Sequence, residues 1–210
     1  MIITHHGKQF FKLQTGDTVL ALNPISKDST LKTSGFGATI AFTSLNHPDY
    51  NGVETVAYAG KEPFIINGPG EYEVSDIMIQ GFKSVGTDGK KEYINTVYYF
   101  EFDGIKILFL GALYQPELGL ELRQAVGDVD LLFVPIGGKT VINAEAAHKL
   151  ALSFAPKVII PMDFGTDQEA DALKTFIKES GDDKVERMEK WTLKSRDLTG
   201  KELDVVVIES

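Results

Sequence analysis

The pattern of apolar residues changes half-way along the chain, and this change most restricts the folds that the chain can adopt. The first half has short segments rich in β-branched and aromatic residues, separated by Gly, Pro, Asp and Asn, which is typical of antiparallel strands. The second half alternates short apolar segments with segments of helical periodicity. Wholly apolar strands between helices indicate a sheet covered on both faces. Together the two patterns predict two packed sheets with helices outside.

The expected elements can be placed along the sequence. The Asp103-Gly104 pair between two apolar runs is the strongest signal for a tight hairpin. We expect strands over residues 10–13, 18–22, 38–43, 54–59, 64–66, 72–74, 77–85, 93–102, 105–110, 130–134, 157–160 and 205–208. We expect helices over residues 118–126, 144–154 and 167–179, and a turn with a short strand over residues 180–190. The sequence has no internal repeat or linker, which predicts a single domain over residues 1–210.

The composition argues against several kinds of partner and site. The net charge is −9, from 30 acidic and 21 basic residues, and no basic cluster occurs, so we expect neither nucleic acid nor a membrane as partner. The absence of cysteine excludes disulfides, Cys-bound zinc and a thiol nucleophile. The sequence shows no apolar run long enough to span a bilayer and no signal-peptide pattern at its start. We therefore expect a cytoplasmic protein.

The segment from Ser44 to Tyr50 carries the clearest candidate for a functional site. It follows the apolar residues 39–43, so a strand is expected to deliver His47 and Asp49 into a loop at its carboxyl end. An imidazole and a carboxylate in such a loop are typical of a metal site, but the set of ligands is incomplete here. The adjacent His5 and His6 are interpreted as ordinary strand residues, because neighbouring side chains of a strand point to opposite faces.

Several segments together resemble the metallo-β-lactamase fold superfamily, and in particular its branch of small Zn-dependent hydrolase-like proteins related to L-ascorbate-6-phosphate lactonase. The resemblance rests on residues 3–24, 68–74, 130–138 and 156–162, which occur in the same order as in that branch. Asn23-Pro24 stands where the branch usually has Asp-Pro. The resemblance covers nearly the whole chain. It implies an α+β fold, a four-layer αββα sandwich of two mixed β-sheets.

The resemblance also implies which positions would bind metal, and most of them are substituted. The family's His-x-His-x-Asp-His loop corresponds to residues 45–50, where only His47 and Asp49 keep the family's residue type. The substituted ligand positions are Leu45, Tyr50, Thr87 and Asp163, each in place of a His, and Ala112, in place of the bridging Asp.

These substitutions limit what the site can do. A catalytic zinc ion needs three protein ligands and an open position. Without the bridging carboxylate, no group would hold two cations about 3.5–4 Å apart. We therefore expect no binuclear centre and no resident cofactor. One alternative is a site for a single divalent cation, Mg²⁺, Mn²⁺, Ca²⁺ or Zn²⁺, with the ligands His47, Asp49 and Asp163, assisted by Asp88 and the Tyr50 hydroxyl. The other is that the acids only cap loops and helix N-termini, while His47 bonds to a backbone carbonyl or to Asp163.

Two functions follow from the resemblance and the substitutions. The first is a divergent hydrolase-like protein without the binuclear centre, which acts as a binding or self-assembling module, since relatives in this branch form homo-oligomers. The second is a metal-dependent hydrolase of a small ester, lactone or phosphorylated metabolite, with His47 and Asp49 as catalytic residues of a rebuilt mononuclear site. The expected partners are copies of the same chain and a small-molecule ligand. The sequence leaves open whether the chain is an enzyme.

Overall fold

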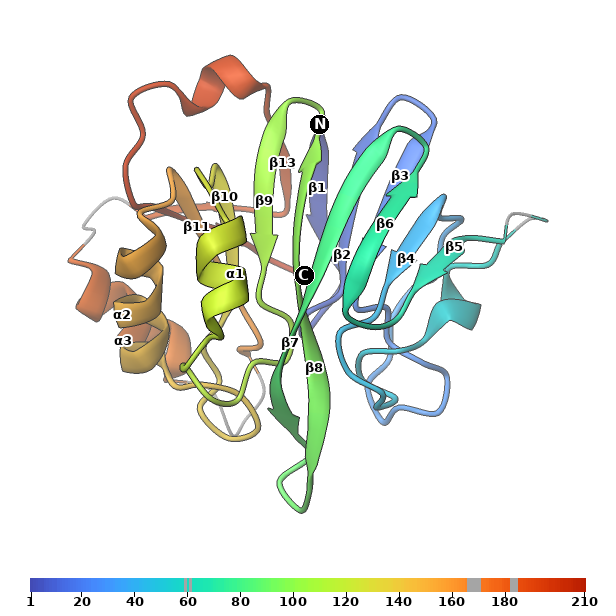
Figure 1. The fold of residues 1–210 in the computed structure, drawn as a ribbon, viewed down its shortest axis with the longest axis horizontal. Coiled ribbons are helices and arrows are strands. Elements are labelled where there is room, and N and C mark those ends of the chain that lie inside the picture. Colours follow the sequence, from blue (N-terminus) through green and yellow to red (C-terminus); the bar gives the residue numbers. More distant parts are fainter. Residues whose placement is uncertain (59, 61, 166–170, 182–184) are drawn as a thin grey trace.

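The computed structural model describes residues 1–58, 60, 62–165, 171–181 and 185–210, and these residues form two mixed β-sheets packed face to face (Figure 1). The six-stranded sheet has, from edge to edge, the strands β13 (Lys190–Thr192), β1 (Ile2–His5), β2 (Phe11–Thr15), β3 (Thr18–Leu22), β4 (Ile40–Phe42) and β5 (Phe64–Ile66). β13, β1, β2 and β3 pair antiparallel, whereas β3, β4 and β5 pair parallel.

The second sheet has eight strands. From edge to edge they are β12 (Glu186–Met188), β14 (Asp204–Ile208), β11 (Val158–Met162), β10 (Leu131–Pro135), β9 (Ile105–Phe109), β8 (Glu92–Phe102), β7 (Ile77–Thr87) and β6 (Gly70–Val74). β6 to β9 form antiparallel hairpins, and the strands from β9 to β12 across the sheet pair parallel. The α+β class and the sandwich of two mixed sheets are therefore confirmed.

The main core lies between the two sheets. It contains the inward-facing aromatic residues of both, among them Phe11 and Phe42 from the first sheet and Tyr98, Phe109 and Phe133 from the second. These rings meet edge-on at centroid distances of 5.0–6.0 Å, which adds specific contacts to the burial of apolar surface.

Helices cover the outer face of the eight-stranded sheet. They are α1 (Leu120–Ala125), α2 (Ala144–Phe154) and α3 (Ala172–Ser180), and they gather on one side of the molecule (Figure 1). α2 begins where the Asn143 side chain accepts a hydrogen bond from the Ala146 N–H, and it ends at Ala155, which has a left-handed backbone. Among the described residues, none of the helices is long and apolar enough to cross a membrane.

A thinner layer covers the outer face of the six-stranded sheet. It consists of the loop over residues 24–37 and the short 3-10 helix η1 (Val53–Thr55), whose apolar side chains pack with Phe10, Val19 and Ala41. A second 3-10 helix, η2 (Ser195–Leu198), lies between β13 and β14.

The main differences from the expected elements lie at three places. The strand expected over residues 54–59 is wrong: residues 53–55 form η1, where the Thr55 hydroxyl and N–H both bond to the Gly52 carbonyl, and residue 59 lies outside the described residues. The helix expected from residue 167 is described from Ala172 onward, because residues 166–170 lie outside the described part. β13 was not expected, because its pairing with β1 is made at long range.

His5 joins the two sheets at the end of β1. Its side chain is buried, its ring stacks on Phe11 at 4.4 Å, and its Nδ1 lies 2.9 Å from the carbonyl oxygen of Ile208 in β14. Nε2 lies 3.1 Å from the Lys8 carbonyl oxygen. Burial lowers the pKa of His5 below its ordinary value of 6.5, although the two carbonyls act in the opposite direction.

We predict that His5 makes the fold less stable in mild acid. Because the folded-state pKa lies below 6.5, the unfolded chain binds more protons, so this contribution to stability is present above pH 6.5 and is lost as the pH falls toward the folded-state pKa. Its slope can reach about 1.4 kcal/mol per pH unit. The free energy of unfolding, measured in urea at several pH values between about 5 and 7, should depend less on pH in His5→Gln than in the wild type. An unchanged slope would contradict the assignment.

Candidate functional site

The candidate site lies where several strands of both sheets end. Asn23 follows β3, the segment from Ser44 to Tyr50 follows β4, and Asp163 follows β11. Lys8 lies in the turn between β1 and β2, and the backbone of Asp163 donates a hydrogen bond to the Lys8 carbonyl at 2.9 Å. The two sheets therefore meet at this point.

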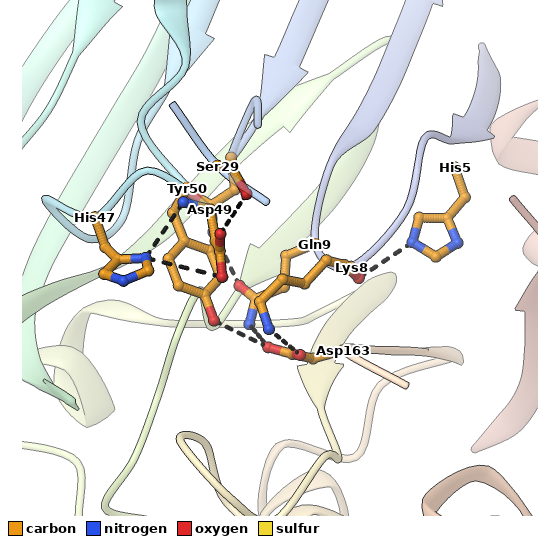
Figure 2. Close-up of polar contacts among 9 residues, drawn as sticks. His5, Lys8, Gln9, Ser29, His47, Asp49, Tyr50 and Asp163 are labelled. Atoms are coloured by element: carbon orange, nitrogen blue, oxygen red, sulfur yellow. Dashed lines mark hydrogen bonds and ion pairs between the residues drawn. The ribbon is translucent and has the colours of Figure 1, made fainter. Parts of the chain in front are cut away.

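The Asp163 carboxylate is the centre of the site. It is fully buried, and three side chains donate to it: Lys8 Nζ at 2.9 Å, Gln9 Nε2 at 2.6 Å and the Tyr50 hydroxyl at 3.2 Å. Figure 2 shows these three side chains converging on Asp163, with His47 on the far side of Tyr50. The Lys8 ammonium compensates the buried negative charge, as a buried carboxylate requires.

Tyr50 acts in this arrangement as a neutral donor. Burial raises the pKa of its phenol well above the ordinary value, and the charge of Asp163 raises that pKa further. The Lys8 ammonium also lies 5.4 Å from the centre of the Tyr50 ring, within the range of a cation–π contact. The three groups Lys8, Tyr50 and Asp163 thus form one compact unit.

Amide and hydroxyl groups extend the polar network away from Asp163. The Asn23 amide donates to Gln9 Oε1 at 2.9 Å and to Ser44 Oγ at 2.8 Å, and the Ser44 N–H donates to Asn23 Oδ1 at 2.7 Å. At the next strand end, the Ala112 N–H donates to Asn95 Oδ1 at 2.8 Å. Within the described residues, no buried side-chain nitrogen or oxygen lacks a hydrogen-bond partner.

Apolar groups fill the space beside this network. Leu45, Tyr50 and Ala112, three of the substituted ligand positions, pack together with Val141, and all four are at most 3% exposed. The fit around Leu45 is tight, since a Cβ added to Gly86 would lie 2.5 Å from Leu45 Cδ1. This part of the site is therefore packed as a small hydrophobic core.

His47 and Asp49 lie next to each other, on the other side of Tyr50 from Asp163 (Figure 2). The Asp49 N–H donates to His47 Nδ1 at 3.2 Å, and His47 Nδ1 is 3.9 Å from Asp49 Oδ2. Asp49 Oδ1 accepts a hydrogen bond from Ser29 Oγ at 2.6 Å. In the described part of the chain, no group of three or more His, Cys, Asp or Glu side chains is arranged to hold a metal ion.

Thr87 and Asp88 serve the turn between β7 and β8. The Thr87 hydroxyl donates to the Lys91 carbonyl at 2.9 Å. Asp88 accepts hydrogen bonds from the backbone of Lys90 and Lys91 and from the Tyr93 hydroxyl, and these donors hold the pKa of its carboxyl well below the ordinary value. The contacts of both side chains are those of residues that stabilise a hairpin turn.

Sequence reasoning missed the donors of the site. Lys8 and Gln9 were not considered, although they follow Gly7 in the opening hairpin. Asn23 was noted only as a departure from the family's Asp-Pro pair. That departure was the available signal, because an amide in place of a carboxylate can donate to Gln9 as well as accept from Ser44.

Comparison with known proteins identifies the family. The sequence profile of the β-lactamase superfamily domain matches residues 2–163. The chain belongs to this family. Among solved structures, the Thermotoga maritima protein assigned to the Zn-dependent hydrolases of the metallo-β-lactamase superfamily is 28% identical, with a TM-score of 0.77 over 99% of this chain and 98% of that one.

Further matches are found in structure and in sequence. A metal-dependent hydrolase-like protein from Parabacteroides distasonis has a TM-score of 0.66 at 16% identity, and covers 99% of this chain and 92% of its own. In sequence, a UPF0173 protein of Pyrococcus furiosus is 33% identical and a UPF0173 metal-dependent hydrolase of Thermococcus onnurineus 30% identical, each over 101 residues. These matches span 48% and 47% of this chain and 45% of each relative, so the chain spans less than half the length of these relatives.

We predict that the Lys8 ammonium is essential to the stability of this family member. Lys8→Met leaves the buried Asp163 charge without its cation, which should lower the free energy of unfolding by about 3–5 kcal/mol. The double variant Lys8→Met/Asp163→Asn should recover part of this loss, because it removes the uncompensated charge as well.

Urea unfolding followed by circular dichroism measures both effects. Lys12→Met is the matched control, since Lys12 is also half-buried in the opening hairpin but contacts the Phe36 ring instead of a carboxylate. Equal losses in Lys8→Met and Lys12→Met, or no recovery in the double variant, would contradict the ion pair's role.

Proposed function

We propose that this chain is a member of the family that has lost the binuclear metal centre and acts as a binding or self-assembling module. The observation that carries the proposal is the Lys8 ammonium 2.9 Å from Asp163, at the position that the resemblance assigns to the last metal-binding His. A positive charge of the protein itself stands beside this carboxylate. A divalent cation bound to Asp163 would be repelled by that ammonium at short range.

The other side chains at the assigned positions also do not fit a binuclear centre. The side chains of Leu45 and Ala112 have no atom that could bind a metal ion. Both belong to the same buried apolar cluster. Tyr50 is held as a neutral phenol by burial and Asp163, whereas a metal-bound tyrosine is expected to be a phenolate. His47 and Asp49 supply two ligand side chains, fewer than the three that a catalytic zinc site needs.

A second candidate function is hydrolysis at a rebuilt mononuclear site. Its support is that relatives are named metal-dependent hydrolases and that His47 and Asp49 are partly accessible, with side chains 32% and 23% exposed. Such a site would need a further ligand from solvent or substrate. The first proposal is preferred because Asp163 is fully buried and accepts hydrogen bonds from Lys8, Gln9 and Tyr50, and because Tyr50 lies between it and His47 (Figure 2).

Self-assembly is supported by the edge of the six-stranded sheet. β5 is the terminal strand there, and Phe64 and Ile65 on it are 51% and 45% exposed. Large apolar side chains on both faces of an unprotected edge strand favour pairing with another chain. We propose that two copies pair through β5.

Metal analysis tests the loss of the centre. Protein purified without chelator, then dialysed against zinc or manganese, should contain far less than one equivalent of metal by mass spectrometry, while a zinc-binding member of the family treated in parallel retains its metal. Stoichiometric metal that His47→Ala/Asp49→Ala removes, together with hydrolysis of an ester, lactone or phosphorylated compound that the same variant abolishes, would replace the first proposal by the second.

Light scattering after size-exclusion chromatography tests self-assembly through β5. We expect the wild type to be a dimer or larger and Ile65→Lys to be monomeric, because the introduced charges repel across the paired edges. Leu152→Lys, at an α2 position that is 47% exposed, is the matched control and should leave the mass unchanged. A monomeric wild type, or dissociation by both substitutions, would contradict the β5 interface.

A further inference from the structure

The other sheet has an edge of a different character. β6 is a terminal strand of the eight-stranded sheet, and within the described residues it pairs only with β7, antiparallel. On its free side, the N–H and C=O groups of every second residue point away from β7. Glu71 and Glu73 are both exposed and, being two residues apart, lie on the same face of the strand. This edge therefore offers backbone hydrogen-bonding groups beside two carboxylates.

A pocket lies on the outer face of the sheet beside this edge. Its volume is about 290 Å³, and Glu71, Met78, Gln80 and Tyr99 are among the residues that line it. Pairing places Glu71 beside Gln80 and Gln80 beside Tyr99, in one row across three strands. Met78 contributes apolar surface to the pocket, and this large hydrophobic side chain is 61% exposed.

Charge determines what can occupy this surface. Glu101 is a second carboxylate at the pocket beside Glu71, and Glu73 adds a third on the neighbouring edge. The Lys106 Nζ at the pocket donates to Asp128 at 3.4 Å. The surface therefore carries more negative than positive charge. In an antiparallel pair of β6 strands centred on Tyr72, Glu71 of one copy would face Glu73 of the other, and like charges directly opposite each other are destabilising. A second copy of the chain thus does not suit this edge, but a basic strand does.

We propose that the β6 edge binds an extended basic peptide segment, which adds a strand to the eight-stranded sheet. Basic side chains at alternate positions would face Glu71 and Glu73, with their methylene groups toward Met78 and the Tyr99 ring, while the peptide backbone pairs with β6. The Tyr99 ring is held in place by its hydroxyl, which donates to the Asp128 carbonyl at 3.0 Å. This binding surface is separate from the candidate site, so the proposal stands whether or not the chain binds metal.

A fluorescently labelled peptide with the sequence Lys-Val-Lys-Val-Lys serves as the probe, and fluorescence anisotropy on the full chain measures its affinity. We expect binding to the wild type and about tenfold weaker binding to Glu71→Gln/Glu73→Gln, because two facing charge pairs are lost. The matched control Glu145→Gln/Glu179→Gln removes two exposed charges from α2 and α3, and should bind as the wild type does. The same peptide with N-methyl groups on alternate backbone amides should not bind, because strand addition needs those donors.

Every other outcome overturns the proposal. No binding to the wild type would mean that Glu71 and Glu73 only protect the edge from aggregation. Equal weakening in both Gln variants would indicate general attraction to an acidic protein, and binding of the N-methylated peptide would exclude strand addition. Dimerisation of Glu71→Gln/Glu73→Gln at the expense of peptide binding would indicate a second copy as the natural occupant. The N-methylation leaves the protein unchanged, so misfolding of a variant cannot explain that result.

Discussion

The burial of the Asp163 carboxylate is the constraint on which the candidate site depends. An ionised carboxylate removed from water costs several kcal/mol unless a cation and hydrogen-bond donors replace the solvent. Lys8 supplies the cation, and Gln9 and Tyr50 supply neutral donors. Lys8 and Gln9 come from the six-stranded sheet and Asp163 from the eight-stranded sheet, so compensation of one charge also joins the two halves of the sandwich.

In the rest of the site, each buried polar side chain is hydrogen-bonded by the next one along a chain. The Gln9 side chain donates its N–H to Asp163, and because it is buried its side-chain oxygen needs a hydrogen-bond donor as well. The Asn23 amide is that donor. Asn23 in turn holds Ser44, which leads into the loop that carries Tyr50. The close approach of Ser44 to the backbone at residue 111 requires a glycine there. Gly111 has a φ of +60°, and a Cβ added to it would lie 2.5 Å from Ser44 Cβ. The polar network thus reaches from one sheet to the other without an unbonded buried group.

Local signals fixed the elements that the sequence predicted well. α2 has the predicted bounds, because its apolar residues recur with helical spacing and Asn143 caps its first turn. The Asp103-Gly104 turn also lies where it was predicted, and both residues have the positive φ that such a turn requires. The two patterns of apolar residues already predicted two packed sheets, and the family resemblance added that both sheets are mixed.

Long-range contacts account for what the sequence did not predict. Lys8 and Asp163 are 155 residues apart, and nothing near either residue marks them as partners. β13 is a three-residue strand that forms only because β1 presents a free edge to it. The metal-site hypothesis rests on the residue types at the assigned ligand positions. The role of Tyr50 depends instead on its hydrogen bond to Asp163, which residue types alone do not reveal.

The sheet edges at β5 and β6 illustrate how side chains select a partner when the backbones are alike. β5 and β6 follow each other in the sequence, separated by residues 67–69, yet each ends a different sheet. An apolar edge such as β5 can pair with the same edge of a second copy. In such a twofold pair apolar side chains meet apolar side chains, and no like charges face each other. An acidic edge cannot do so without facing its own charges, but it can pair with a strand of opposite charge. Under the two proposals, the exposed Phe64 and Ile65 on one edge and Glu71 and Glu73 on the other place self-association and peptide binding on separate edges of the same fold.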